Sequence, residues 1–113
     1  MRVLKKKKPR SFLVSQKNNI NLKDVGTVYL NDDEHLTITG NNKKIYEICK
    51  KSWGYYATSS INFRQKKNGF KTALVKQDRK FFVLIVDKDK RSNFKSYIKK
   101  ENYKIIKWLD EKR

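Results

Sequence analysis

The spacing of hydrophobic and polar residues predicts short strands in the first half of the chain. Apolar or β-branched residues alternate with polar ones over residues 25–30 and again over residues 36–39. A period of two is typical of a strand with one buried face. The sequence Asn31-Asp32-Asp33 between the two runs favours a turn. We therefore expect the two runs to pair as a β-hairpin.

The next segment, residues 44–49, fits either a strand or a helix. In a strand, Tyr46 and Ile48 would share one face. In a helix, apolar residues up to Trp53 would recur at helical spacing, and Gly54 would end the element. We favour the strand, and the sequence leaves the helix as an alternative.

Two helices are expected in the second half. The first runs over residues 61–68, because the Ser and Thr side chains of residues 58–60 can cap its start and Gly69 can adopt the left-handed conformation that ends it. Residues 92–100 form the second, because their apolar side chains fall on one helical stripe. A last strand is expected over residues 103–109.

Residues 70–76 and 80–86 are expected to pair as antiparallel strands across a polar turn. The second strand is apolar on both faces, so we expect it to be central and covered on both sides. Large aromatic residues with apolar neighbours usually belong to the core, and we place Phe81, Phe82 and Trp108 there.

The predicted order of elements is β-β-β-α-β-β-α-β, which indicates the α+β class with a small mixed or antiparallel sheet and two short helices. From residue 44 onward this order matches the β-α-β-β-α-β unit of ferredoxin-like folds, preceded by the β-hairpin. A chain of 113 residues is long enough for one core. We expect a single α+β domain over residues 21–113.

Residues 1–20 are expected to form a flexible basic N-terminal arm. They contain four consecutive lysines at residues 5–8 and a polar run at residues 16–19. Such a composition buries too little apolar surface to offset the entropy lost on ordering the backbone.

Positive charge dominates the composition. The chain has 29 Lys and Arg residues against 11 Asp and Glu residues, a formal net charge of +18. An AT-rich coding sequence would also raise lysine, but it would raise glutamate as well, and only four Glu accompany 23 Lys. We therefore favour a polyanionic partner, most of all nucleic acid, over codon bias alone.

Basic residues are interleaved with aromatic ones, a pairing typical of proteins that bind single-stranded nucleic acid. Lysine and arginine neutralise phosphates, and aromatic rings stack on bases. Trp53 and Tyr56 lie beside lysines and Gly54, so we assign them to a binding surface, with burial in the core as the alternative. The residues expected to contact nucleic acid are Lys5, Lys6, Lys7, Lys8, Arg10, Lys50, Lys51, Trp53, Tyr56, Arg64, Lys66 and Lys67.

The sequence offers little that indicates an enzyme. His35 is the one histidine, and it follows three acidic residues at a turn, where consecutive side chains diverge and do not converge on one metal ion. Cys49 is the one cysteine, so no disulfide can form within the chain, and we expect it to pack in the core. The glycines are scattered and do not form a phosphate-binding loop. We expect a non-enzymatic protein without a cofactor or metal.

Membrane association is a further alternative. No apolar run reaches the roughly 20 residues of a membrane span, and the first residues lack the apolar stretch of a signal peptide, so we expect a cytoplasmic protein. A lysine-rich arm is nevertheless attracted to an anionic membrane surface. The oligomeric state cannot be predicted from these patterns.

Two motifs carry a resemblance. The sequence W-G-Y-Y-A-T-S-S-I-N at residues 53–62 and the closing W-L-D-E at residues 108–111 resemble a set of small uncharacterised bacterial proteins found beside surface-polysaccharide genes. The resemblance covers roughly residues 25–111. It implies a different function, that of an accessory or scaffold protein in surface-polysaccharide biosynthesis.

Overall fold

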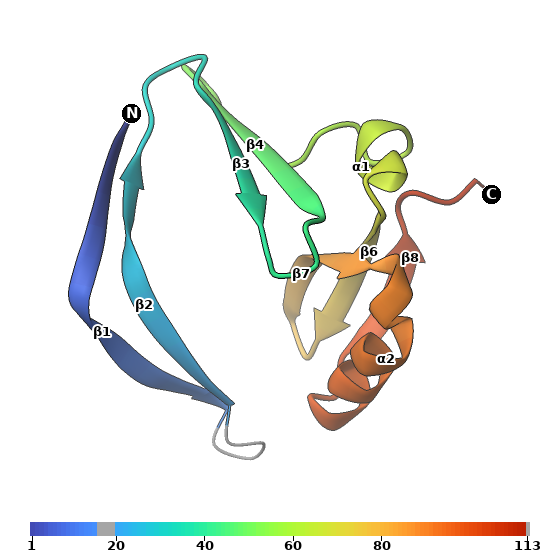
Figure 1. Ribbon diagram of the computed structural model, residues 1–113. Helices are drawn as coiled ribbons and strands as arrows, with labels where there is room; N and C mark the ends of the chain where they lie inside the picture. The colour runs from blue at the N-terminus through green and yellow to red at the C-terminus, as the bar shows by residue number, and fades with distance from the viewer. Residues whose placement is uncertain (16–19, 113) are drawn as a thin grey trace.

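The computed structural model describes residues 1–15 and 20–112, which form strands in three separate sheets together with two α-helices and one 3-10 turn (Figure 1). In chain order the elements are β1 (Arg2–Ser15), β2 (Ile20–Tyr29), β3 (His35–Thr39), β4 (Ile45–Lys51), β5 (Gly54–Tyr56), α1 (Arg64–Lys67), β6 (Phe70–Gln77), β7 (Lys80–Asp87), η1 (Lys88–Lys90), α2 (Arg91–Lys100) and β8 (Lys104–Trp108).

The described strands pair antiparallel throughout. β1 and β2 form a two-stranded hairpin, β3, β4 and β5 form a second sheet in that order, and the third sheet has the order β7-β6-β8. The chain is therefore α+β, as predicted. The ferredoxin-like arrangement is not confirmed, because β4 pairs with β3 and β5 instead of joining β6. A short turn connects β3 to β4, so pairing these neighbours costs little loop-closure entropy.

The predicted strand at residues 44–49 is confirmed as β4, and the helical alternative there is wrong. The predicted hairpin between residues 25–30 and 36–39 is also wrong, because β2 pairs with β1 and β3 pairs with β4. The polar turn between β2 and β3 is held to β4 instead. The N–H of Asp33 donates to the Lys50 carbonyl at 2.8 Å, which directs β3 along β4.

The basic segment at the N-terminus forms strand β1. The hairpin of β1 and β2 thus crosses the boundary expected at residue 20, while the polar run at residues 16–19 lies outside the described residues. The ladder is interrupted between the pairs Lys5↔Gly26 and Arg10↔Asp24, where four residues of β1 bulge out opposite one residue of β2. Pro9 lies in this bulge, where its missing N–H leaves no ladder hydrogen bond unmade.

Gly26 is required by the close approach of the two strands at this bulge. Its φ is +157°, and a Cβ built there would lie 2.3 Å from the carbonyl oxygen of Leu4. A bulge also bends and twists a ribbon. The hairpin accordingly curves along its length (Figure 1).

The hydrophobic core is centred on β6. Ala73 and Val75 are fully buried, and Val86 of β7 is 4% exposed. The side chains that pack around them come from β7, β8 and α2 and the turn between them: Leu84, Phe94, Tyr103, Ile105 and Trp108. The predicted core position of Trp108 is confirmed.

The expectation that residues 81–86 form a central strand is wrong. β7 is an edge strand, with Phe81 60% exposed and Val83 56% exposed. The connection from β7 forms α2 on one face of the sheet and then places β8 on the far edge of β6, so β6 takes the central position (Figure 1). Phe82 is 37% exposed, so neither phenylalanine is buried in the core as predicted.

Helix α1 (Arg64–Lys67) is shorter than the expected helix over residues 61–68. The Ser60 Oγ accepts a hydrogen bond from the Arg64 N–H at 2.9 Å, so Ser60 does supply the side-chain oxygen at the start of the helix. Gly69, with φ at +95°, follows the end of the helix as expected.

A pair of valine substitutions tests this placement of the core. Val75→Ala removes two methyl groups from a fully buried position, and we expect it to lower the free energy of unfolding by about 2 kcal/mol. Val83→Ala is the matched control on the edge strand and should change it by less than about 0.5 kcal/mol. Urea denaturation followed by tryptophan fluorescence measures both. Equal losses would contradict the assignment of β7 to the edge.

Candidate nucleic-acid interface

The β1–β2 hairpin carries a dense group of exposed cations. Six lysine or arginine residues lie on β1 and one on β2, against a single carboxylate, Asp24. These cations are Arg2, Lys5, Lys6, Lys7, Lys8, Arg10 and Lys23. All seven side chains are exposed.

Asp24 neutralises only one of these cations. Its carboxylate accepts from the Lys6 Nζ at 2.6 Å, and this hydrogen bond lowers the pKa of Asp24. Arg2 and Arg10 instead lie over the rings of Tyr29 and Phe12, at 4.1 Å and 5.5 Å from the ring centroids. For Lys5, Lys7 and Lys8, no ion pair with a carboxylate of the described residues is formed.

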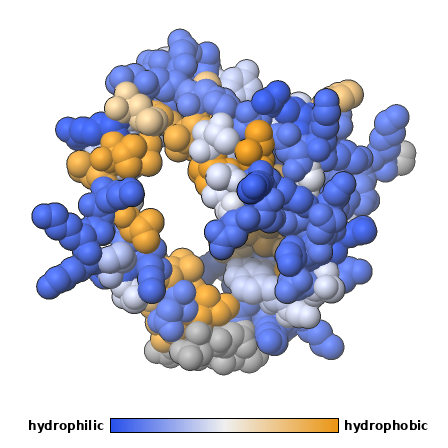
Figure 2. All heavy atoms as spheres, in the orientation of Figure 1, coloured by the Kyte–Doolittle hydropathy of each residue, from blue (hydrophilic) through white to orange (hydrophobic). Residues whose placement is uncertain are grey.

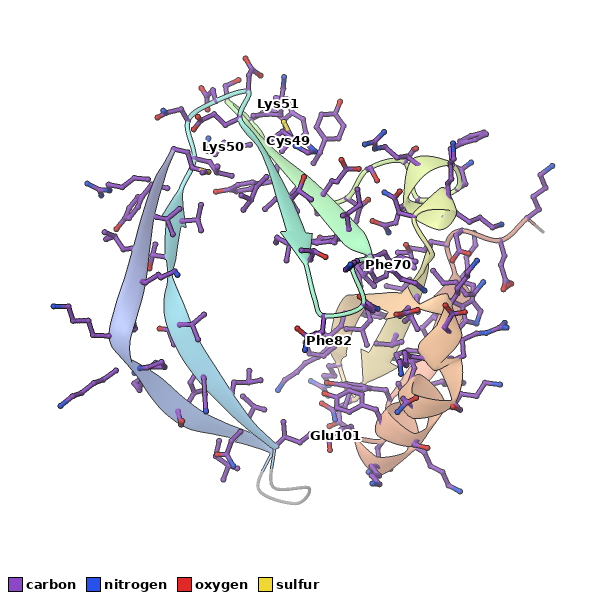
Figure 3. All side chains as sticks on the ribbon, viewed as in Figure 1. Cys49, Lys50, Lys51, Phe70, Phe82 and Glu101 are labelled. Atoms are coloured by element: carbon purple, nitrogen blue, oxygen red, sulfur yellow. The ribbon has the colours of Figure 1, made fainter. Side chains whose placement is uncertain are left out.

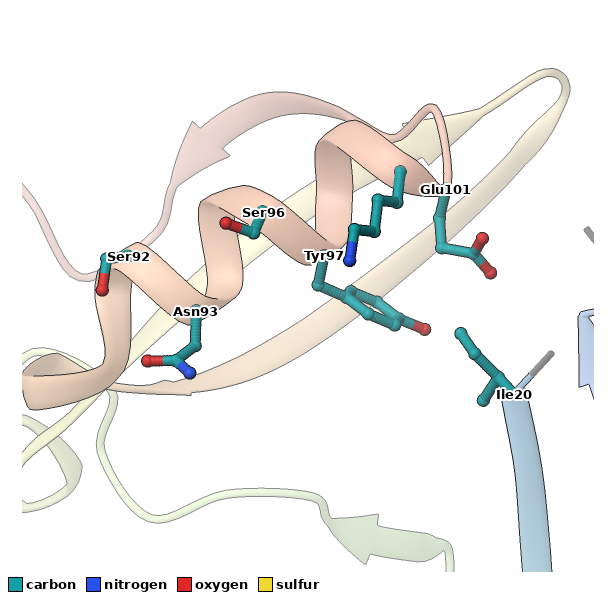
Figure 4. Close-up of a pocket in the computed structure, with 7 residues that line it drawn as sticks. Ile20, Ser92, Asn93, Ser96, Tyr97 and Glu101 are labelled. Carbon is teal, nitrogen blue, oxygen red and sulfur yellow. The ribbon is translucent and has the colours of Figure 1, made fainter. Parts of the chain in front are cut away.

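The hairpin lies close to other parts of the chain at its two ends. At the base, the N-terminal amine of Met1 donates to the Glu34 carboxylate at 3.1 Å. At the other end, Ile20 and Tyr97 of α2 point toward one another across a pocket of about 450 Å³ (Figure 4). Between these ends an opening passes through the molecule, with hydrophobic residues around its rim and hydrophilic residues projecting outward from the hairpin (Figure 2).

A second group of predicted contact residues lies at the β4–β5 end of the second sheet. Lys50 and Lys51 lie near the N-terminus of the chain (Figure 3). Their Nζ atoms donate to the carboxylates of Asp32 and Asp33 at 2.8 Å and 2.5 Å. These hydrogen bonds raise the pKa of both lysines, so each is held positively charged but is already paired.

The aromatic residues of this group are exposed. Trp53 is 66% exposed and Tyr56 is 57% exposed, and their rings lie edge to face with centroids 5.5 Å apart. Neither ring fills the core, so the alternative of core burial is wrong for both. A base could reach a ring face at this edge of the sheet.

The third group lies on α1 and is partly engaged in structural contacts. Lys66 donates to the backbone carbonyl of Asp110 at 3.3 Å, and the side chain of Lys67 is exposed. Arg64 pairs with Glu47 through both its Nε and its Nη2, the latter at 2.9 Å from Glu47 Oε2. Its guanidinium thus fastens α1 to β4.

Glu47 of β4 is the centre of a polar cluster beside the second sheet. The residue is 6% exposed, and its carboxylate also contacts His35 Nε2 at 3.1 Å and Asn68 Nδ2 at 3.5 Å. The hydrogen bond from Arg64 is the main reason that the pKa of Glu47 lies below its usual value. This cluster was not predicted from the sequence, although an acidic residue between apolar neighbours in a strand indicates a buried partner.

A pocket of about 510 Å³ adjoins this cluster. His35, Glu47, Cys49 and Arg64 line it together with hydroxyl-bearing residues. Cys49 is half-buried at the wall and lies opposite His35 in the strand register, so it is less enclosed than the core position we expected. Within residues 1–15 and 20–112, no three His, Cys, Asp or Glu side chains come together in a way that could hold a metal ion.

Comparisons with known protein families, with curated proteins and with solved structures find no match to this chain. The resemblance to small bacterial proteins therefore stays a prediction. Neither helix in the described part of the chain has the length and apolar composition that a membrane span requires.

The Glu47 cluster predicts a pH-dependent stability. Glu47→Gln places an amide against Arg64, removes the charge and should lower the melting temperature at neutral pH. Because the pKa of Glu47 is lowered in the folded chain, the contribution of the ion pair is complete above the unfolded pKa of about 4.3 and is lost as pH falls through the lower folded value. Thermal melts of both proteins are recorded from neutral pH to below the folded pKa of Glu47. The two melting temperatures should converge at the lowest pH. A constant difference at every pH would contradict this electrostatic role.

Proposed function

We propose that this protein binds nucleic acid through the cations of its β1–β2 hairpin and has no catalytic role. One observation carries the proposal: seven exposed cations share a narrow two-stranded ribbon with one carboxylate. Nucleic acid is a regular array of negative charge, and cations that neutralise its phosphates release bound counterions. The hairpin supplies such cations at close spacing.

The distribution of ion pairs supports the hairpin over the other two groups. To bind a phosphate, three cations of these groups would first have to lose a carboxylate partner: Lys50, Lys51 and Arg64. The loss of that ion pair offsets part of the free energy gained from the phosphate contact. Lys7 and Lys8 form no ion pair with a described residue, so a phosphate contact costs them no such exchange. We therefore rank the hairpin cations as the main phosphate contacts.

Trp53 supplies a second contact in this proposal. Its ring is exposed beside Tyr56 at the β4–β5 end, close to the two lysines of that group. A base stacked on such a ring contributes about 1–3 kcal/mol without reading sequence.

Binding to an anionic membrane surface is a second candidate, and one observation favours it. The hairpin exposes large apolar side chains among its lysines, including Leu13 at 44%, Val14 at 50% and Val25 at 62%. Apolar contact together with lysine charge is the combination that holds peripheral proteins on anionic lipid. Sedimentation with vesicles of phosphatidylserine and phosphatidylcholine, with and without competing nucleic acid, separates the two candidates.

The electrostatic basis of the proposal predicts a steep salt dependence. In anisotropy titrations with a labelled oligonucleotide, the logarithm of the binding constant should fall linearly with the logarithm of salt concentration, with a slope that indicates roughly four to eight phosphate contacts. The double variant Lys7→Ala/Lys8→Ala should reduce this slope by about two.

The control removes the same charge from another surface. Lys95→Ala/Lys99→Ala takes two exposed lysines from α2 and should leave the slope nearly unchanged. Equal effects of the two double variants would show that net charge alone governs binding. A binding constant that does not change with salt would overturn the proposal.

The role of Trp53 is tested by truncation. Trp53→Ala should weaken binding to single strands by about 5- to 150-fold, because a stacking platform is lost. The free energy of unfolding should change by no more than about 0.5 kcal/mol, because the ring is exposed. Trp53→Phe keeps an aromatic ring and serves as the matched control. Unchanged affinity of Trp53→Ala would remove this residue from the interface.

A further inference from the structure

The β1–β2 hairpin is a ribbon of two strands with both edges free of further strands in the described part of the chain. Two strands lie about 4.8 Å apart, and side chains add a few ångströms on each side. The major groove of B-form DNA is about 12 Å wide and admits a two-stranded β-ribbon. We infer, on the basis of the proposed function, that the hairpin binds in the major groove of double-stranded DNA.

The length of the ribbon fits a groove. A strand rises about 3.3 Å per residue, so the paired ribbon, set by the 10 residues of β2, extends over roughly 30 Å, the length of about nine base pairs. The bulge held by Gly26 bends the ribbon along this length (Figure 1).

The two faces of the outer half of the hairpin differ. The strand register places Ser11 opposite Lys23 and Leu13 opposite Asn21 on one face. The other face carries the pair Phe12↔Leu22. Asparagine and lysine side chains match the acceptor and donor groups that bases present in the major groove. The face with Asn21 and Lys23 is therefore the one that meets the bases.

The lysines of the bulge complete the contact. Lys7 and Lys8 lie in the irregular segment opposite β2, where both side chains are exposed, and in this inference they contact the phosphates that border the groove. A-form double-stranded RNA does not offer the same fit, because its major groove is too deep and narrow for side chains to read. Single strands have no groove at all. The ribbon thus selects B-form DNA.

The first test compares three nucleic acids of one sequence: a DNA duplex of about 20 base pairs, its single strand, and the corresponding RNA duplex. At fixed salt the DNA duplex should bind at least about tenfold more tightly than either of the others. Methyl green, which occupies the major groove, should displace the protein, and netropsin, which occupies the minor groove, should not.

Two substitutions leave the net charge unchanged, so they test the geometry of the ribbon independently of its charge. Gly26→Ala places a methyl group against the backbone of Leu4 and should lower affinity for the DNA duplex by about tenfold. Gly40→Ala is the matched control, because a Cβ there lies 3.9 Å from its nearest neighbour, the Asn42 Oδ1. Circular dichroism with thermal melting shows whether the β7-β6-β8 core remains folded in both variants.

A second pair of variants keeps the inference testable if Gly26→Ala unfolds the protein. Asn21→Ala should weaken duplex binding by about 5-fold or more, whereas Leu22→Ala, the next residue on the opposite face, should not. Equal affinity for duplex and single strands, displacement by netropsin alone, or equal effects of Asn21→Ala and Leu22→Ala would overturn the major-groove inference while the proposed function stands. Failure to bind any of the three nucleic acids would overturn the proposed function itself.

Discussion

Carboxylates are scarce in this chain, and the fold depends on where the few of them lie. Lys44 pairs with Asp87 and with Asp89, the latter at 2.8 Å, and so fastens the β3–β4 turn to the end of β7. Glu47 fastens β4 to α1 through Arg64. In the described part of the chain the buried hydrophobic residues are Ala73, Val75 and Val86, so these polar junctions hold together sheets that share little apolar contact.

The C-terminus is fixed in the same way. The Asp110 carboxylate accepts from the Thr72 N–H at 2.8 Å and from the Lys71 Nζ at 3.1 Å, and these contacts join the segment after β8 back to β6. Burial by itself would raise the pKa of Asp110, but the hydrogen bonds from Thr72 and Lys71 outweigh it, and the pKa lies below its usual value. Lys71 also lies 4.9 Å from the centroid of the Trp108 ring, so one ion pair supports both the end of the chain and the core.

Because most acidic groups secure such junctions, the charge that remains is strongly positive and uneven. In α1 and the third sheet, Lys66 and Lys71 serve as structural donors. On the hairpin, one carboxylate faces seven cations, and three of these, Lys6, Lys7 and Lys8, lie in the bulge between two paired stretches of the ladder. The positive charge of the surface and the stability of the body are therefore linked through the same shortage of carboxylates, and the proposed binding function follows from it.

The sequence by itself determined the class of the fold and much of its local structure. A strand pattern favoured β4, two apolar runs across a polar turn identified β6 and β7, a helical stripe identified α2, and the lysines and Gly54 beside Trp53 favoured a surface position. These features depend on neighbours a few residues apart, which a sequence displays directly. The excess of lysine, and with it the expectation of a polyanionic partner, is likewise a property of composition.

Only the tertiary structure decided which strands pair and which faces are covered. Taken alone, the lysine-rich N-terminus is typical of a flexible arm. In the structure it pairs with β2 through backbone hydrogen bonds, and its charges lie along a two-stranded ribbon. The apolar pattern of residues 81–86 predicts a central strand. In the structure β8 pairs with the other edge of β6, so β7 is an edge strand and Phe81 is exposed. Glu47 and Arg64 lie 17 residues apart and meet only when α1 folds onto β4. Such contacts join distant parts of the chain, and local periodicity carries no information about them because it reports on the faces of one element at a time.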